Sequence, residues 1–224
     1  MSWRREQTND RFFRLAKVEG YRARSAYKLM EICEKFQLVR LKQLVLDLGA
    51  TPGSWSQLAI ERVGPEGRVV AIDLQPMAPI LGVETMVGDV REEATRAEIL
   101  QKLGGLADVV LSDMAPQATG IAITDQARAI ELAETALDIA TKTLRPGGSL
   151  VVKVFRGEDF DKFIVSARRH FANVNVAIPH ATRAESREVY VVARGFGFPR
   201  PVVKPAAKPK ETKLKKAKHR RLRK

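Results

Sequence analysis

Between residues 44 and 55 the chain reads Leu44-Val-Leu-Asp-Leu-Gly-Ala-Thr-Pro-Gly-Ser-Trp55. The apolar half predicts a buried strand, and the glycine-rich half predicts a tight turn into a helix that begins at about Ser54. Such a turn can bring its backbone close to a ligand, or it can be a plain packing turn. It contains neither the Gly-Lys-Ser/Thr of a P-loop nor the Gly-x-Gly-x-x-Gly of a dinucleotide site. The turn alone therefore identifies no ligand.

Six more short apolar runs follow this strand and alternate with helical patterns. The seven expected strands span residues 44–48, 69–73, 85–87, 107–112, 149–155, 174–178 and 188–193. Strands and helices that take turns predict an α/β fold with a doubly wound, mostly parallel sheet. Only a loop separates the last two strands, so we expect an antiparallel pair near one edge of the sheet.

The clearest helix lies between the fourth and fifth strands. Thr124 is its expected N-cap, and Pro146-Gly147-Gly148 is its expected stop. One face should carry apolar residues at helical spacing, namely Ile130, Ala133, Leu137, Ala140 and Leu144. A second helix, near the start of the chain, should begin after an N-cap at Ser25.

Charge divides the chain into three parts. The net charge of +13 is distributed as +6 over residues 1–42, −4 over residues 43–199 and +11 over residues 200–224. We expect a basic, aromatic arm over residues 1–24, one folded domain over residues 25–198 and a disordered tail over residues 199–224. Basic ends on a near-neutral body favour a polyanionic partner, either nucleic acid or an anionic membrane surface.

The membrane alternative has little support in the sequence. No apolar run reaches the about 18 residues that a membrane span requires, and the start of the chain lacks a signal peptide. We therefore expect a cytoplasmic protein that binds no membrane. The single cysteine, Cys33, cannot form an intrachain disulfide, and its apolar helical neighbours favour a packing role over a reactive thiol.

Acidic residues follow two strands at the edge of the predicted sheet where ligands bind. Asp73 ends the second strand about twenty residues after the glycine-rich turn, where a carboxylate can accept both hydroxyls of a cofactor ribose. Asp89 follows the third strand, and Gly53 follows the first. Each acid could instead be a helix cap or a turn residue. Together they favour a cofactor that contains a nucleoside.

The fourth and fifth strands add an acid and a base. Asp113 directly follows the fourth strand, and Pro116 stiffens the loop that holds it. Lys153 lies inside the apolar run of the fifth strand, where a charge is costly to bury. Its ammonium could reach past the strand end to solvent. The functional alternative is a desolvated amine that serves as a base.

Four separated motifs resemble those of the FtsJ/RrmJ family of S-adenosylmethionine-dependent RNA ribose 2′-O-methyltransferases. They are the turn at 47–55, Ser112-Asp-Met-Ala-Pro116, Val151-Val-Lys-Val-Phe155 and Ser186-Arg-Glu-Val-Tyr190, and Gly20-Tyr-Arg-Ala-Arg-Ser-Ala-Tyr-Lys-Leu29 precedes them. The resemblance covers about residues 10–196 and implies a Rossmann-like methyltransferase sheet of seven strands. Within this family, a methionine directly after the aspartate, as at Met114, resembles the motif of the bacterial ribosomal-RNA methyltransferases more than that of the transfer-RNA methyltransferases.

The resemblance also assigns residues to roles. It implies a catalytic tetrad of Lys28, Asp113, Lys153 and Glu188, with Lys153 as the base. It implies that S-adenosylmethionine is bound by Gly53, Trp55, Asp73, Asp89 and Asp113. No metal is expected, because His170, His180 and His219 are scattered and the chemistry requires none.

The expected function is methyl transfer to a ribose 2′-hydroxyl, most directly at a uridine of large-subunit ribosomal RNA. The partner would be ribosomal RNA or the large ribosomal subunit, and the enzyme would be a monomer. RNA phosphates would contact the basic tail and six arginines of the arm, namely Arg4, Arg5, Arg11, Arg14, Arg22 and Arg24. The alternatives are a transfer-RNA methyltransferase, a small-molecule methyltransferase of the same fold and a non-catalytic RNA chaperone.

Overall fold

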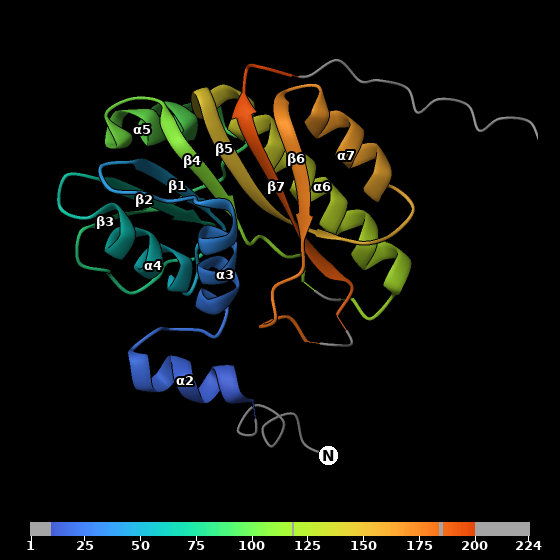
Figure 1. Ribbon diagram of the computed structural model, residues 1–224, viewed down its shortest axis with the longest axis horizontal. Coiled ribbons are helices and arrows are strands. Elements are labelled where there is room, and N and C mark those ends of the chain that lie inside the picture. Colours follow the sequence, from blue (N-terminus) through green and yellow to red (C-terminus); the bar gives the residue numbers. More distant parts are fainter. Residues whose placement is uncertain (1–9, 118, 184–185, 200–224) are drawn as a thin grey trace, which may run out of the picture.

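The structure, a computed structural model, describes residues 10–117, 119–183 and 186–199. A seven-stranded sheet forms its centre, with the strand order β3-β2-β1-β4-β5-β7-β6 (Figure 1). The strands are β1 (Leu44–Leu48), β2 (Arg68–Asp73), β3 (Val83–Val87), β4 (Ala107–Ser112), β5 (Leu144–Phe155), β6 (Phe171–Ala177) and β7 (Glu188–Phe196). The seven strands predicted from the sequence are therefore confirmed, and β2, β3, β5, β6 and β7 are longer than expected.

The direction of the strands matches the predicted mixed sheet. β1 to β5 pair in parallel, and β7 pairs antiparallel with both β5 and β6. Parallel strands joined by helices bring their carboxyl ends to the same edge of the sheet. The loops after β1, β2, β3 and β4 consequently meet at that edge, where the acids found in the sequence lie.

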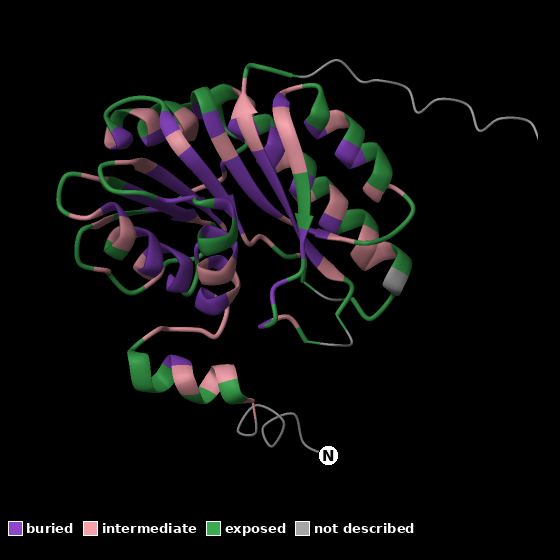
Figure 2. Cartoon of the chain, in the orientation of Figure 1, coloured by how far each residue is buried: buried purple, intermediate pink, exposed green. Residues whose placement is uncertain are grey.

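Helices cover both faces of the sheet, and buried residues concentrate between them and the strands (Figures 1 and 2). On one face pack α3 (Ala26–Phe36) and α4 (Ser54–Val63), and on the other pack α5 (Glu93–Leu103), α6 (Ala122–Thr143) and α7 (Phe160–Arg168). On β1, Val45 faces the first group and Leu46 the second. A strand buried on both faces explains why the apolar runs are nearly continuous rather than alternating.

The long helix α6 differs from its prediction at both ends. It begins at Ala122, not after a Thr124 cap, because Asp125 in its first turn accepts hydrogen bonds from the backbone N–H and hydroxyl of Thr119 and from the N–H of Gly120. It ends at Thr143, because the next residue, Leu144, pairs with Ala107 and opens β5. The predicted stop at Pro146-Gly147-Gly148 therefore lies inside that strand.

The start of the chain folds against α3. The helix α2 (Arg11–Glu19) is capped by Asp10, and its Ala16 packs with Tyr27 of α3 and with Ala181. Ser25 precedes α3 as predicted but makes no side-chain cap, because its hydroxyl pairs with that of Ser54 at 2.8 Å. The basic tail predicted from residue 199 falls almost entirely outside the described residues, so its disorder stays a prediction.

Cys33 lies on the buried face of α3, and burial raises the pKa of its thiol to about 12, which agrees with a packing role. Within the described part of the chain, no helix combines the length and the apolar character needed to cross a membrane.

Candidate active site

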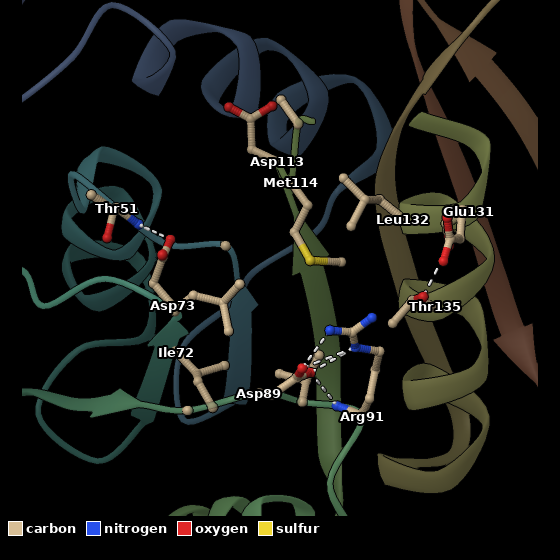
Figure 3. A pocket seen from close by; sticks show the side chains of 15 residues that line it. Thr51, Ile72, Asp73, Asp89, Arg91, Asp113, Met114, Glu131, Leu132 and Thr135 are labelled. Atoms are coloured by element: carbon tan, nitrogen blue, oxygen red, sulfur yellow. Dashed lines mark hydrogen bonds and ion pairs between the residues drawn. The ribbon is translucent and has the colours of Figure 1, made fainter. Parts of the chain in front are cut away.

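A pocket of about 350 Å³ opens at the carboxyl edge of the sheet (Figure 3). Asp73 at the end of β2, Asp89 after β3 and Asp113 after β4 all line it. Its apolar walls come from Ile72, Val90, Met114 and Leu132. The structure thus brings together three of the five residues predicted to bind a cofactor.

Asp73 is held in place by the backbone around it. One carboxylate oxygen accepts the N–H of Gln75 at 2.9 Å, and the other accepts the N–H of Thr51 at 3.0 Å. A carboxylate has about four lone-pair sites, so both oxygens can still accept hydrogen bonds from a ligand. Asp73 therefore combines a fixed position with free acceptor capacity.

Asp89 is paired with a neighbouring cation. Arg91 donates to both of its carboxylate oxygens, through Nε at 2.9 and 3.0 Å and through Nη2 at 2.5 Å. Hydrogen bonds from the side chain and backbone of Arg91 lower the pKa of Asp89. Asp89 is consequently ionised at neutral pH and is an acceptor only.

The glycine-rich turn shapes the floor of the pocket. Gly49 has a φ of +69°, and a Cβ on it would lie 2.5 Å from Cγ of Met114. Only glycine allows both this backbone conformation and this contact. The turn therefore allows Met114 to approach the first strand and form part of the pocket wall.

Gly53 and Trp55 do not line the pocket. Trp55 is buried, and its indole N–H donates to the carbonyl of Ser25 at 2.9 Å. Its ring centroid lies 5.6 Å from that of Tyr190. Trp55 thus supports the start of α3, and a direct contact with a cofactor stays a prediction for both residues.

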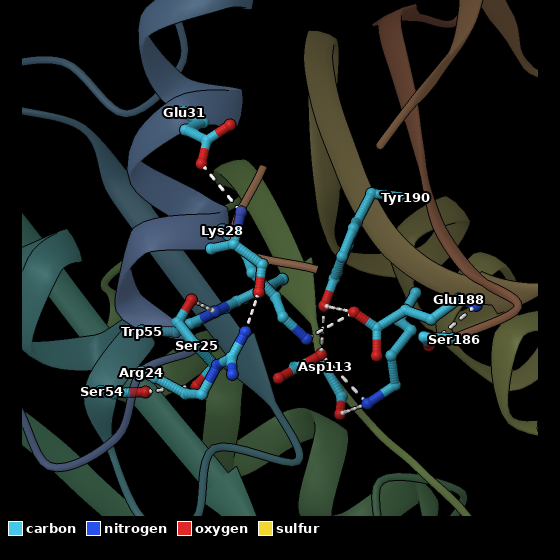
Figure 4. Close-up of polar contacts among 12 residues, drawn as sticks. Arg24, Ser25, Lys28, Glu31, Ser54, Trp55, Asp113, Ser186, Glu188 and Tyr190 are labelled. Carbon is cyan, nitrogen blue, oxygen red and sulfur yellow. Dashed lines mark hydrogen bonds and ion pairs between the residues drawn. The ribbon is translucent and has the colours of Figure 1, made fainter. Parts of the chain in front are cut away.

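The four residues of the predicted tetrad form two ion pairs, and one of the four, Asp113, also lines the pocket. Figure 4 shows Lys28, Asp113 and Glu188 close to one another. Nζ of Lys153 lies 3.0 Å from Oδ1 of Asp113 and donates to the carbonyl oxygen of Asp113 at 2.6 Å. Lys28 on α3 forms an ion pair with Glu188 at the start of β7. All four side chains are 10–21% exposed, so each pair is shielded from bulk water yet reachable from it.

Tyr190 joins the two ion pairs. Its hydroxyl lies 2.9 Å from Oδ1 of Asp113 and 3.1 Å from Oε1 of Glu188. Burial and the two carboxylates raise its pKa well above the ordinary value, so it stays protonated. A phenol carries one proton, so it donates to one carboxylate at a time. Tyr190 links both halves of the tetrad.

Sequence reasoning did not single out Tyr190, although a signal was present. Residues two apart on a strand point to the same face of the sheet, so Tyr190 lies on the same face as Glu188. A tyrosine at that position is fully buried here, and a buried hydroxyl needs a polar partner. The pairing of β7 with β5 sets Tyr190 opposite Lys153.

Asp47 is a second residue that the sequence did not mark. It lies on β1, is 1% exposed, and accepts a hydrogen bond from the hydroxyl of Ser56 at 2.6 Å. Burial is the main cause that raises its pKa to about 7. Burial therefore favours the protonated form of Asp47, and its hydrogen bond with Ser56 ties β1 to α4.

A second, more basic cleft of about 410 Å³ adjoins the tetrad. It is lined by Arg24, Lys28, Arg183, Ser186 and Glu188. Arg24 forms an ion pair with Asp10 and donates to the carbonyl of Ala181. Burial and the nearby charge of Arg183 lower the pKa of Arg24. The cleft is suited to an anionic group next to the reactive centre.

Two of the arm arginines expected at phosphates are engaged within the protein. Arg24 has the contacts just described, and Arg22 donates to three backbone carbonyls. Arg11 and Arg14 are exposed on α2, whereas Arg4 and Arg5 lie outside the described residues. Among the described residues, no cluster of His, Cys, Asp and Glu could hold a metal ion.

Known proteins resemble this chain over most of its length. A family model described as FtsJ-like methyltransferase matches residues 21–196. Ribosomal RNA large subunit methyltransferase E from Azoarcus sp. (strain BH72) is 50% identical over 192 residues, which cover 85% of this chain and 94% of that protein. The protein of the same name from Marinobacter nauticus is 48% identical over 195 residues, covering 87% and 94%.

Solved structures agree with the sequence comparison. The crystal structure of a Plasmodium falciparum protein described as a candidate ribosomal RNA methyltransferase superposes with a TM-score of 0.69. The two chains share 29% sequence identity, and the match covers 79% of this chain and 98% of the other.

Proposed function

The chain belongs to the FtsJ-like methyltransferase family, and we propose that it transfers a methyl group from S-adenosylmethionine to a ribose 2′-hydroxyl of large-subunit ribosomal RNA, at a uridine. One observation carries the proposal. Asp113 lines the pocket and also binds Lys153, so the pocket and the tetrad share a residue. A donor in the pocket and a hydroxyl at the tetrad would therefore be neighbours.

The pocket suits the methyl donor in its chemistry. Asp73 has free acceptor capacity for two ribose hydroxyls, and the apolar walls suit a purine ring. Asp89 is an ionised acceptor on the pocket wall, where an amino group of the donor would take the place of Arg91. When bound, S-adenosylmethionine supplies a methyl group that its sulfonium already activates.

The chain's own residues would position the hydroxyl and remove its proton. Two acceptors on Asp113 occupy two directions around Nζ of Lys153. A neutral amine that donates to both keeps its lone pair for a third direction. There it would take up the proton of the 2′-hydroxyl as the methyl group passes from the sulfonium sulfur, which leaves as a thioether, to that oxygen.

Lys28 and Glu188 would set the electrostatics of this step. Glu188 holds the ammonium of Lys28 near the proposed position of the hydroxyl, where that ammonium would stabilise negative charge as it develops on the 2′-oxygen. Tyr190 connects the two pairs and would keep them in register. Proximity and orientation then account for much of the rate.

The basic surface favours RNA over a small substrate. The cleft beside the tetrad carries Arg24, Lys28 and Arg183, and the net positive charge of the sequence lies entirely at its two ends. Phosphate contacts of this kind position an RNA without reading its bases. The names of the relatives support ribosomal RNA in particular.

We also propose a cytoplasmic location and a monomeric state. Ribosomal RNA, the proposed substrate, is cytoplasmic in bacteria, and a single chain supplies all members of the tetrad. A metal is not part of the proposal, because the activated methyl group needs no Lewis acid.

A comparison of substrates tests the function. The full chain is incubated with S-adenosylmethionine labelled in the methyl group and with ribosomal RNA, large ribosomal subunits or transfer RNA. We expect label in ribosomal RNA, free or assembled. Label confined to transfer RNA would move the enzyme to another substrate class, and no label in any RNA would refute the proposal.

A further inference from the structure

Arg22 connects two loops that are far apart in the sequence. It lies between α2 and α3, and its Nη1 donates to the carbonyl oxygens of Pro52 at 3.0 Å and Ala78 at 2.6 Å. Its Nη2 donates to the carbonyl oxygen of Pro79 at 2.7 Å. One guanidinium thus fastens the loop after β1 to the loop after β2.

These two loops form part of the cofactor pocket. Thr51 and Leu74 line it, one from each loop. The N–H of Thr51 donates to Asp73, the last residue of β2 before the second loop, so the first loop also contacts the carboxylate proposed to bind the ribose (Figure 3). A change in their separation would move both groups.

The packing at Gly53 fits this arrangement. A Cβ on Gly53 would lie 2.6 Å from Cδ1 of Ile80 and 3.0 Å from Nη1 of Arg22. The residue also has a φ of +109°, which disfavours any side chain. The absence of a side chain at Gly53 thus makes room for Arg22 and for the second loop, whereas the sequence suggested room for a ligand.

The backbone around Arg22 is fixed as well. Its N–H donates to Oε1 of Gln57 on α4 at 2.9 Å, and Nε2 of Gln57 donates to the carbonyl of Gly20 at 3.0 Å. The guanidinium therefore extends from a fixed backbone position in the arm of residues 1–24 toward the two loops that line the pocket.

We propose that Arg22 is a positioning residue for S-adenosylmethionine and not a contact to RNA phosphate. The inference rests on the proposed function, because it assumes that this pocket binds the cofactor. A planar guanidinium can donate in several fixed directions at once, whereas a lysine ammonium is a single point charge. Arg22 acts through this geometry, and its charge alone would not suffice.

Substitutions separate geometry from charge. Arg22→Lys keeps the positive charge but removes the forked guanidinium whose two terminal nitrogens reach three carbonyl oxygens. Arg22→Gln removes the charge. Arg14→Gln is the matched control, because Arg14 is an exposed arginine of α2 on the same arm. Affinity for S-adenosylmethionine is measured by calorimetry, and RNA affinity is measured at several salt concentrations. Thermal unfolding checks that each variant is folded.

We expect both Arg22 variants to bind S-adenosylmethionine about three- to tenfold more weakly than the wild type, which is the scale of the net contribution of one ordinary hydrogen bond. The salt dependence of their RNA binding should be that of the wild type. Arg14→Gln should leave cofactor affinity unchanged, and each RNA phosphate that Arg14 neutralises in the wild type should make the salt slope of this variant shallower by about 0.7 to 0.9.

Other outcomes would overturn the inference. Unchanged cofactor affinity in both Arg22 variants, or full recovery with lysine, would show that the fork does not position the cofactor. A shallower salt slope in Arg22→Gln would return the residue to phosphate binding. A wild-type chain that fails to bind S-adenosylmethionine would instead refute the proposed function, so the two failures are distinct.

Discussion

Replacement of Lys153 by arginine separates the charge of this residue from its capacity to accept a proton. Lys153 is 10% exposed and donates to the carbonyl of Asp113 at 2.6 Å, with Oδ1 of the same residue at 3.0 Å. A guanidinium can keep such charged contacts, so Asp113 would stay paired. It cannot take up a proton, because it remains ionised throughout the accessible pH range. The loss is therefore confined to general base catalysis.

The magnitude follows from that loss. A positioned base contributes about 10²- to 10⁴-fold to a rate, or about 3 to 5.5 kcal/mol of activation free energy. We expect Lys153→Arg to lower the rate of methyl transfer by this factor and to leave affinity for S-adenosylmethionine near that of the wild type. The rate is measured in a single turnover, with enzyme in excess over RNA, so that product release does not contribute.

The control is Lys162→Arg on α7, since Lys162 is 76% exposed and pairs with Asp159. It should react at the wild-type rate. A Lys153→Arg enzyme that keeps more than about a tenth of the wild-type rate would refute proton abstraction by Lys153. Its role would then be electrostatic positioning of the ribose.

Three further predictions concern neighbouring residues. Asp73→Ala should weaken S-adenosylmethionine binding by about 1.5 to 3 kcal/mol, the scale of hydrogen bonds to a charged group, and calorimetry that finds an unchanged affinity would remove Asp73 from the site. Tyr190→Phe should lower the single-turnover rate about tenfold and the free energy of unfolding by about 1 to 3 kcal/mol, because it removes the hydroxyl that lies between the carboxylates of Asp113 and Glu188. A denaturant unfolding curve identical to that of the wild type would contradict this prediction. Folding raises the pKa of Asp47 from 3.8 to about 7, so the folded protein binds this proton more tightly than the unfolded chain does. The contribution of Asp47 to the free energy of unfolding should therefore fall as the pH rises from about 4 to 7, by up to about 1.4 kcal/mol per pH unit. Asp47→Asn should flatten that decline in denaturant unfolding, and an identical pH profile would show that Asp47 is ionised in the folded state.

The strands and the edge that holds the site could be predicted from the sequence, because both depend on local patterns. Apolar runs determine the strands, and the parallel arrangement places Asp73, Asp89 and Asp113 at one edge. The ends of α6 could not be predicted in the same way. Its start depends on the hydrogen bonds that Asp125 accepts from Thr119 in the preceding loop, and its end depends on the pairing of Leu144 with Ala107 of β4.

The tetrad depends on contacts between distant parts of the chain. Lys28 and Glu188 are 160 residues apart and meet only because α3 packs near the start of β7. Their roles followed from the resemblance of motifs and not from periodicity or charge. Arg22 shows the limit of charge alone, because a cation that the sequence assigns to RNA donates to carbonyls in the fold.

The chemical position of the transferred methyl group tests the proposed activity most directly. After reaction with labelled S-adenosylmethionine, the ribosomal RNA is hydrolysed in alkali, which cleaves next to a free 2′-hydroxyl and leaves the bond intact where that oxygen is methylated. We expect the label to be recovered in an alkali-resistant dinucleotide with a uridine on its 5′ side. Label in a single nucleotide, released with the methyl group on a base, would contradict methyl transfer to a ribose 2′-hydroxyl.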